Sequence, residues 1–100
     1  MADASITLYR GAAATSNTTL YTSPSGIAVT VTNVAITNTT TAAVTATLNL
    51  ATVALVSSLS IPANSTQFID MDQVIYNGET ITGSASTTAV NFHISGNEIY

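Results

Sequence analysis

Charge is scarce in this 100-residue sequence. Only six residues are charged, one Arg and five Asp or Glu, whereas about a quarter of the residues are charged in ordinary soluble domains. Arg10 and Asp70 are consecutive charged residues, and the 59 residues between them carry no formal charge. Because acid–base catalysis needs several titratable side chains in one place, this composition argues against an enzyme.

Other absences narrow the possible partners. The chain has no cysteine, so it has no disulfides and no thiolate metal ligands, and packing or oligomerisation must stabilise it. No run approaches 18 consecutive apolar residues, which excludes a membrane-spanning helix. With a net charge of −4 and Arg10 as the only permanent cation, little can neutralise phosphates. We therefore expect neither nucleic acid nor a membrane as a partner.

Uncharged polar residues take the place of the missing charges. The chain contains 19 Thr, 11 Ser and 8 Asn beside 46% hydrophobic residues, and its mean hydropathy is +0.41. Disordered chains combine low hydrophobicity with high net charge, so this chain is expected to fold. Its length suits one domain, residues 1–100.

Apolar residues alternate with polar ones, which predicts β-strands. The clearest alternation covers residues 27–32, where the apolar positions are odd. Beyond it the apolar residues Val34 and Ile36 stand at even positions. We therefore expect a β-bulge at Thr32-Asn33 that keeps the apolar face directed inward.

Turn residues separate further strands. The segment 38–41 is interpreted as a turn, so the strands around it, 27–37 and 44–50, are predicted to form a hairpin. Pro62 ends the strand that begins at Val53, because proline cannot donate to a strand ladder. Asn77-Gly78 is typical of a tight turn with positive φ. Shorter strands are expected at 5–9, 18–22, 66–71, 81–85 and 90–94.

These segments give about eight short strands and almost no helix. Their spacing predicts an all-β fold, a single antiparallel β-sandwich of jelly-roll or immunoglobulin-like type.

His93 is the only histidine. A metal site or a general base would need partner groups that the sequence hardly supplies. His93 alternates with Phe92 and Ile94, so it should face away from the core, toward solvent or a neighbouring subunit. No Gly-x-Ser-x-Gly motif accompanies the many serines. We therefore expect no catalytic residue and no cofactor.

Asp70 and Asp72 lie on one face of an extended segment. With Glu79 or Glu98 nearby in space, their oxygens could bind a hard cation. The favoured interpretation is that they cap a turn at Asp72-Gln73 and keep that end of the molecule soluble. No metal site is therefore predicted.

Tyrosines are the candidates for contacts with other molecules. Tyr9, Tyr21, Tyr76 and Tyr100 are half-polar aromatics that could stack on sugars or anchor a protein interface. Tyr100 is the preferred candidate for a contact between subunits. The predicted interface residues are Tyr9, Tyr21, His93 and Tyr100.

Three Asn-x-Ser/Thr sequences, at Asn17, Asn38 and Asn64, match the acceptor pattern for N-glycosylation. The segment Met1–Ser5 has no basic residue, so no export signal is expected. The three asparagines are therefore interpreted as turn residues.

A Thr-, Ser- and Asn-rich exterior suits burial against other proteins, because charged groups are costly to desolvate. The lysines that commonly block exposed strand edges are also missing. We expect other subunits to cover these edges in a homo-oligomer, with a trimer favoured, or in a larger lattice. The contacts are expected within the uncharged stretch Gly11–Ile69.

Four strand-and-turn segments cover most of the chain: Leu20-Tyr21-Thr22 with Pro24 and Gly26, Asn33–Thr39, Ser60–Thr66, and Asn91–Gly96 with Glu98-Ile99. Together they resemble the small β-sandwich virion proteins of tailed bacteriophages. The resemblance implies a structural protein without catalytic residues, most simply a capsid cement or decoration protein. Its partners would be further copies of itself and the major capsid protein or another virion protein.

The resemblance also implies a virion location, with the capsid surface favoured, after synthesis in the host cytoplasm without a signal peptide. Two alternatives stay open. One is a head-fibre, neck or tail component, and the other is a virion module that binds host glycans through Tyr and Asn side chains.

Overall fold

Strands account for all the regular secondary structure in residues 3–99, the part of the chain that the computed structural model describes. Alternating apolar and polar positions produce them, as the sequence predicted. The strands in this range are β1 (Asp3–Ala12), β2 (Thr18–Thr22), β3 (Ala28–Asn38), β4 (Val44–Leu50), β5 (Val53–Ile61), β6 (Thr66–Tyr76), β7 (Thr80–Ala85) and β8 (Val90–Ile99).

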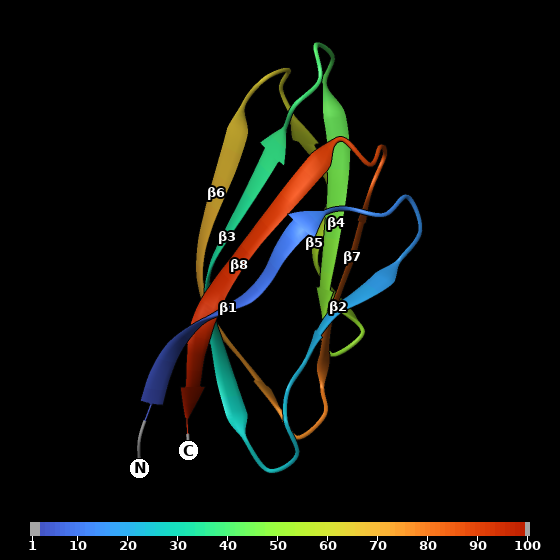
Figure 1. Cartoon of the computed structure of the whole chain (residues 1–100). Coiled ribbons are helices and arrows are strands. Elements are labelled where there is room, and N and C mark those ends of the chain that lie inside the picture. The colour runs from blue at the N-terminus through green and yellow to red at the C-terminus, as the bar shows by residue number, and fades with distance from the viewer. Residues whose placement is uncertain (1–2, 100) are drawn as a thin grey trace.

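The strands form two antiparallel sheets of four (Figure 1). Sheet A has the order β1-β8-β3-β6, and sheet B has the order β2-β7-β4-β5. The chain changes sheet at every connection except the one between β4 and β5. This arrangement is an eight-stranded jelly roll, so the predicted β-sandwich is confirmed and the immunoglobulin-like alternative is excluded.

The predicted hairpin between residues 27–37 and 44–50 is wrong. β3 pairs with β6 and β8 in sheet A, whereas β4 pairs with β5 and β7 in sheet B. Each of these strands has one apolar face, and crossing to the other sheet lets the two faces pack against each other. The connection at residues 39–43 makes this crossing.

Asn38 holds the start of this crossing. It is only 1% exposed. Its Nδ2 lies within hydrogen-bond distance of the carbonyl oxygens of Ala42 (2.8 Å), Pro62 (3.0 Å) and Ile61 (3.1 Å). Its Oδ1 accepts from the main-chain N–H of Thr40 at 2.8 Å and from the Thr40 hydroxyl at 2.7 Å. One buried amide thus joins the end of β3 to the end of β5.

The core lies between the two sheets. Sheet A contributes inward side chains of β1, β3, β6 and β8, and sheet B contributes those of β4, β5 and β7. Its largest fully buried side chains are Phe92, Ile36, Leu48, Ile61, Ile75, Ile81, Ile94, Val29, Val31, Val34 and Val90. Close packing of these groups is the main source of stability in a cysteine-free chain.

The predicted β-bulge at Thr32-Asn33 is confirmed. Thr32 is the extra residue of β3 opposite residues 95–96 of β8. Opposite the same part of β8, the register of β1 also shifts, between Thr7 and Tyr9. A line of bulges therefore crosses sheet A at one level, and it keeps the apolar side chains of β3 directed inward above and below that level.

β6 is longer than predicted and carries the next bulge of this line. It continues beyond Met71 to Tyr76, so the turn predicted at Asp72-Gln73 is wrong. A register shift takes its place. Asp70 pairs with Asn33 of β3, whereas Gln73, three residues later in β6, pairs with Val31, only two residues earlier in β3. A bulge absorbs extra residues without ending the strand.

The turn predicted at Asn77-Gly78 is confirmed. Both residues have positive φ, 53° for Asn77 and 89° for Gly78. The side-chain oxygen of Asn77 also accepts a hydrogen bond from the main-chain N–H of Gly26 at 2.9 Å. The two turns at this end of the sandwich are therefore joined.

The hairpin between β4 and β5 offers a test of local strain. Its two turn residues, Ala51 and Thr52, both have positive φ, 51° and 65°. Such turns favour Asn-Gly, and a β-branched residue with positive φ is strained. We expect the double substitution Ala51→Asn/Thr52→Gly to raise the free energy of unfolding by about 1 kcal/mol in urea denaturation.

The control for this prediction is Thr41→Gly, a substitution of an exposed residue in the connection between β3 and β4. Thr41 is not among the residues with positive φ, so glycine should bring no gain there. A double variant that is no more stable than the parent would show that the turn is unstrained.

Candidate interaction surface

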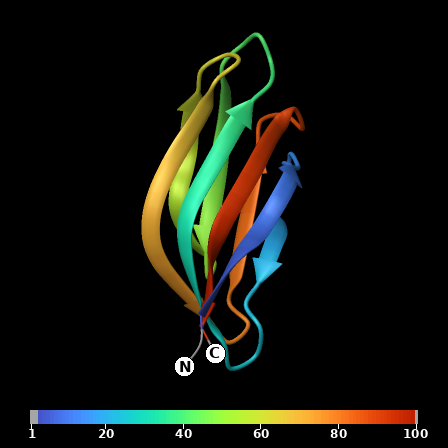
Figure 2. The same ribbon diagram turned by 60° about the vertical axis from the view of Figure 1, so that its left-hand side comes forward.

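The large exposed apolar side chains come from two edge strands of the sandwich. Among the described residues, the large apolar side chains with high exposure are Phe68 (71%), Val53 (69%), Val74 (59%), Tyr76 (52%) and Leu55 (38%). We call these five residues the apolar edge. They come from β5 and β6, which are edge strands of sheets B and A and lie along the same side of the molecule (Figure 2).

The alternation of β6 explains its part of the apolar edge. Ile69, Met71 and Ile75 pack on the core. The even-numbered residues between and beside them point to the outer face of sheet A. From one end of β6 to the other, that outward row is Thr66, Phe68, Asp70, Asp72, Val74 and Tyr76. Apolar side chains therefore flank two carboxylates on one strand.

Asp70 and Asp72 do not cap a turn. Both are exposed on β6, and Asp70 accepts a hydrogen bond from the side-chain amide of Asn33 at 2.9 Å. This contact joins β6 to β3 across the bulge. The carboxylates keep the outer face of β6 polar between its apolar ends.

The one arginine and the one histidine lie on the same outer face as these acids, at the other side of sheet A. Arg10 on β1 pairs with His93 on β8. His93 pairs in turn with Ala35 on β3, which pairs with Phe68 on β6. His93 is exposed, in agreement with the orientation predicted for it. A single cross-strand row therefore leads from Arg10 to Phe68.

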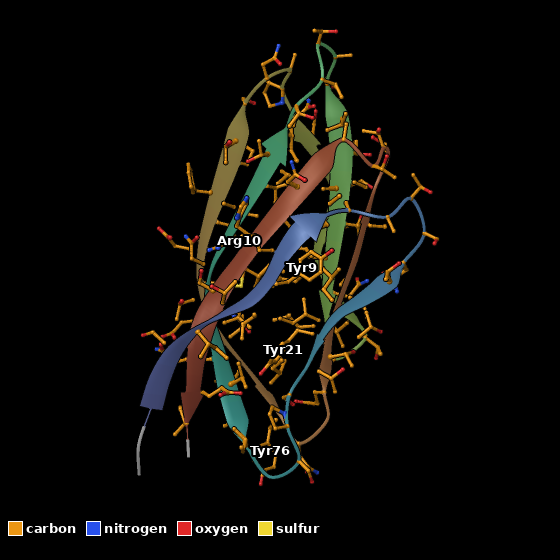
Figure 3. The ribbon with its side chains drawn as sticks, viewed as in Figure 1. Tyr9, Arg10, Tyr21 and Tyr76 are labelled. Atoms are coloured by element: carbon orange, nitrogen blue, oxygen red, sulfur yellow. The ribbon has the colours of Figure 1, made fainter. Side chains whose placement is uncertain are left out.

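Tyr9 and Tyr21 use their hydroxyls within the molecule. Tyr9 is half-buried against the core, and its hydroxyl donates to the carbonyl oxygen of Ala12 at 2.9 Å. Tyr21 is also half-buried, and its hydroxyl donates to Glu98 Oε2 at 3.2 Å, which joins β2 to β8. Figure 3 shows both rings between the sheets, whereas Arg10 points away from them.

The predicted interface residues therefore do not form one cluster. His93 is exposed on the outer face of sheet A, and Tyr9 and Tyr21 lie partly between the sheets. Tyr100 lies outside the described residues. Tyr76, at the end of β6, is the tyrosine that belongs to the apolar edge.

Sequence reasoning missed Phe68 and Val74 as surface residues. The alternation from Ile69 to Ile75 could have identified them, because both have the opposite parity. The predicted turn at Asp72-Gln73 hid this signal by dividing β6 in two.

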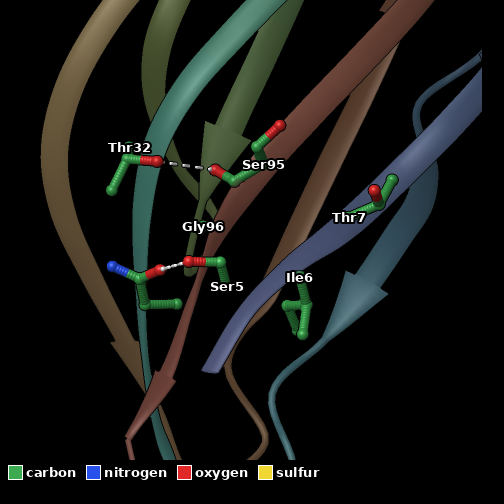
Figure 4. A pocket seen from close by; sticks show the side chains of 7 residues that line it. Ser5, Ile6, Thr7, Thr32, Ser95 and Gly96 are labelled. Carbon is green, nitrogen blue, oxygen red and sulfur yellow. Dashed lines mark hydrogen bonds between the residues drawn. The ribbon is translucent and has the colours of Figure 1, made fainter. Parts of the chain in front are cut away.

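A shallow depression of about 380 Å³ lies on the outer face of sheet A, at the line of bulges. Its lining residues are Ser5, Ile6, Thr7, Thr32, Ser95, Gly96 and Asn97 (Figure 4). The Ser5 hydroxyl donates to Asn97 Oδ1 at 3.0 Å, and the Thr32 hydroxyl donates to the Ser95 carbonyl oxygen at 3.3 Å. The depression offers neutral hydrogen-bonding groups, and none of its lining residues is aromatic.

Sheet B has a different surface. Its four strands contain no charged residue, and Thr45, Thr47 and Asn49 lie along one face of β4. Thr47 and Asn49 pair with Ser84 and Thr82 of β7. All the charged residues that lie within strands belong to sheet A. The uncharged stretch of the sequence supplies three of the four strands of sheet B, β2, β4 and β5, together with β3 of sheet A.

Comparisons with known proteins find no match: no protein-family model and no curated protein matches the chain. Within residues 3–99, no group of three or more His, Asp or Glu side chains is placed to hold a metal ion. The same range has no helix that is long and apolar enough to cross a membrane. The function is therefore inferred from the fold and from the chemistry of its surfaces.

Proposed function

We propose that this protein is a non-enzymatic structural protein of a bacteriophage virion, namely a capsid cement or decoration protein that forms homo-oligomers, with a trimer favoured, and stabilises the shell. The apolar edge is the observation that carries the proposal. A small monomer gains nothing from five large exposed apolar side chains on the edge strands of its two sheets, and exposed apolar surface of this kind is typical of interaction sites.

The uncharged sheet B supports a second contact, with the major capsid protein or another virion protein. Covering a Thr-, Ser- and Asn-lined face removes no charge from water, and its hydroxyl and amide groups can form neutral hydrogen bonds. The jelly roll also supports the proposal by analogy, since many viral capsid domains have this architecture. The part of the apolar edge on β6 belongs to sheet A and the uncharged face belongs to sheet B, so one copy could contact both a further copy and the shell.

A glycan-binding module on the virion is the second candidate. The hydroxyl-lined depression at Ser5, Thr32 and Asn97 favours it, because sugars are bound through neutral hydrogen bonds. Without an aromatic stacking platform the depression would bind a sugar weakly. A glycan array that gives no signal would remove this candidate. A head-fibre, neck or tail component is a further alternative, which a count of copies per particle would distinguish, hundreds for cement and a handful for the others.

The test is the stability of DNA-filled heads with and without the protein. Heads that lack it should break at a lower temperature and under a milder osmotic shock, and purified protein added back should restore them. The variant Phe68→Ser/Val74→Ser should fail to restore them, because it removes most of the exposed apolar surface of β6. The control Ala43→Ser changes an exposed residue of a loop and should restore them fully. Heads of unchanged stability would contradict a cement function.

A further inference from the structure

β1 and β6 are the two edge strands of sheet A, and their outer edges have no partner strand among residues 3–99. They have similar lengths, 10 and 11 residues. Three antiparallel pairings separate them, so β1 and β6 run in opposite directions. If β6 of one copy lay beside β1 of the next, sheet A would continue across the two molecules in its own antiparallel pattern.

The edges of sheet B are less suited to such pairing. β2 has only five residues. The register of β5 shifts twice against β4, and Ser58 in its middle has a φ of 51°. Bulges protect an edge from pairing with a further strand, and β1 and β6 carry only one each, which leaves regularly paired segments of five and four residues on its two sides. Sheet A therefore provides the matched pair of edges.

Charge decides which edges would meet. β6 carries Asp70 and Asp72, whereas Arg10 lies near the end of β1 beside His93. An antiparallel pair of β6 strands centred between these acids would place carboxylates opposite carboxylates, which is unfavourable. A pair of β6 with β1 would instead place Asp70 near Arg10. The charges thus favour a head-to-tail contact over a symmetric one.

We propose that β6 of one copy pairs with β1 of a second copy, with Asp70 opposite Arg10 and Phe68 packed on Ala12. This inference rests on the proposed homo-oligomer and names its contact. The residues that would face each other, 10–12 of β1 and 68–70 of β6, lie within the regularly paired parts of the two strands on one side of the line of bulges. Ala12 is exposed and small, so the large, exposed Phe68 ring fits above it.

Such a contact is heterologous, because different surfaces of the two copies meet. Heterologous contacts close into rings or continue as filaments. We expect a closed ring. In a ring of three copies, the β1 edge and the β6 edge of every sheet A would be paired with a neighbouring copy. The uncharged faces of sheet B would then stay available for the shell.

Charge reversal tests the pairing. Arg10→Glu and Asp70→Arg should each weaken association of the purified full chain by roughly tenfold or more, as measured by analytical ultracentrifugation over a range of concentrations. The double variant should associate nearly as well as the parent, because the pair is restored with its signs exchanged. Circular dichroism should show that all three variants are folded, since both residues are exposed. A parent protein that stays monomeric, or folded variants without rescue in the double variant, would overturn the proposal.

Cysteine cross-linking gives a second, independent test, since the chain has no cysteine of its own. Ala12→Cys and Phe68→Cys variants, mixed and oxidised, should form disulfide-linked dimers of one copy of each. Each variant oxidised alone is the control and should stay unlinked. Dimers from Phe68→Cys alone would indicate a symmetric β6 contact, and the absence of linked dimers in the mixture would also count against the proposed register.

The two proposals can fail separately. A monomer that nevertheless stabilises heads would leave the cement function in place and remove the β6–β1 contact. A ring with the predicted charge rescue that has no effect on heads would retain the contact and remove the cement function.

Discussion

Gly96→Ala is expected to lower the free energy of unfolding by about 3 kcal/mol, a large part of the roughly 5–15 kcal/mol available to a domain. Gly96 is buried on β8 at the line of bulges. A Cβ atom there would overlap with the carbonyl oxygen of Thr30 and lie 3.0 Å from Leu8 Cδ1. Because the carbonyl belongs to a central strand, the backbone of sheet A would have to shift. Urea denaturation measures the loss.

Gly11→Ala is the matched control. Gly11 lies on β1 and pairs with Phe92 of β8, the strand that contains Gly96. A Cβ at Gly11 would lie 3.2 Å from the hydroxyl oxygen of Tyr9, at the far end of a side chain that can move. Its cost should stay within about 1 kcal/mol. If the two variants lost equal free energy of unfolding, the close approach of Thr30 to Gly96 would not be the cause of the loss in Gly96→Ala.

Asn38→Asp is expected to lower the free energy of unfolding by roughly 3–4 kcal/mol at neutral pH. The substitution replaces the amide donor by a carboxylate oxygen that faces the carbonyl oxygens of Ala42, Ile61 and Pro62. The site is buried, so water cannot compensate for the lost donors or the added charge. Thermal unfolding should show a fall in Tm of roughly 15 °C.

Asn17→Asp serves as the control because it makes the same chemical change at an exposed residue. Asn17 Oδ1 accepts a hydrogen bond from Asn49 at 3.2 Å, and a carboxylate can still accept it. The control should therefore unfold close to the parent. If Asn38→Asp did the same, the connection from β3 to β4 would not depend on the buried amide.

Local sequence patterns were sufficient to predict the secondary-structure elements themselves. Alternation predicted most strands, the parity change around Thr32 predicted the bulge in β3, and Asn77-Gly78 predicted a turn with positive φ. Each of these features depends on neighbours within a few residues, where side-chain direction and backbone preference act directly. The outward orientation of His93 followed in the same way.

Local sequence patterns did not predict which strands pair with one another. Residues 27–37 and 44–50 look like the two arms of a hairpin, yet the buried contacts of Asn38 begin a crossing to the other sheet. Asp72-Gln73 looks like a turn, yet pairing with β3 carries β6 through it as a bulge. In both cases long-range pairing and burial of an apolar face outweighed the local turn preference.

The sequence by itself determined a sparsely charged, cysteine-free β-sandwich, because composition and alternation are properties of the chain. Only the tertiary structure decided which outward residues form a surface. Phe68 is exposed on the edge strand β6, whereas Ala35, its outward neighbour on the central strand β3, is buried because this small side chain lies between Phe68 and His93 on the two flanking strands. Exposure depends on strand order, and strand order arises from contacts between residues far apart in the sequence.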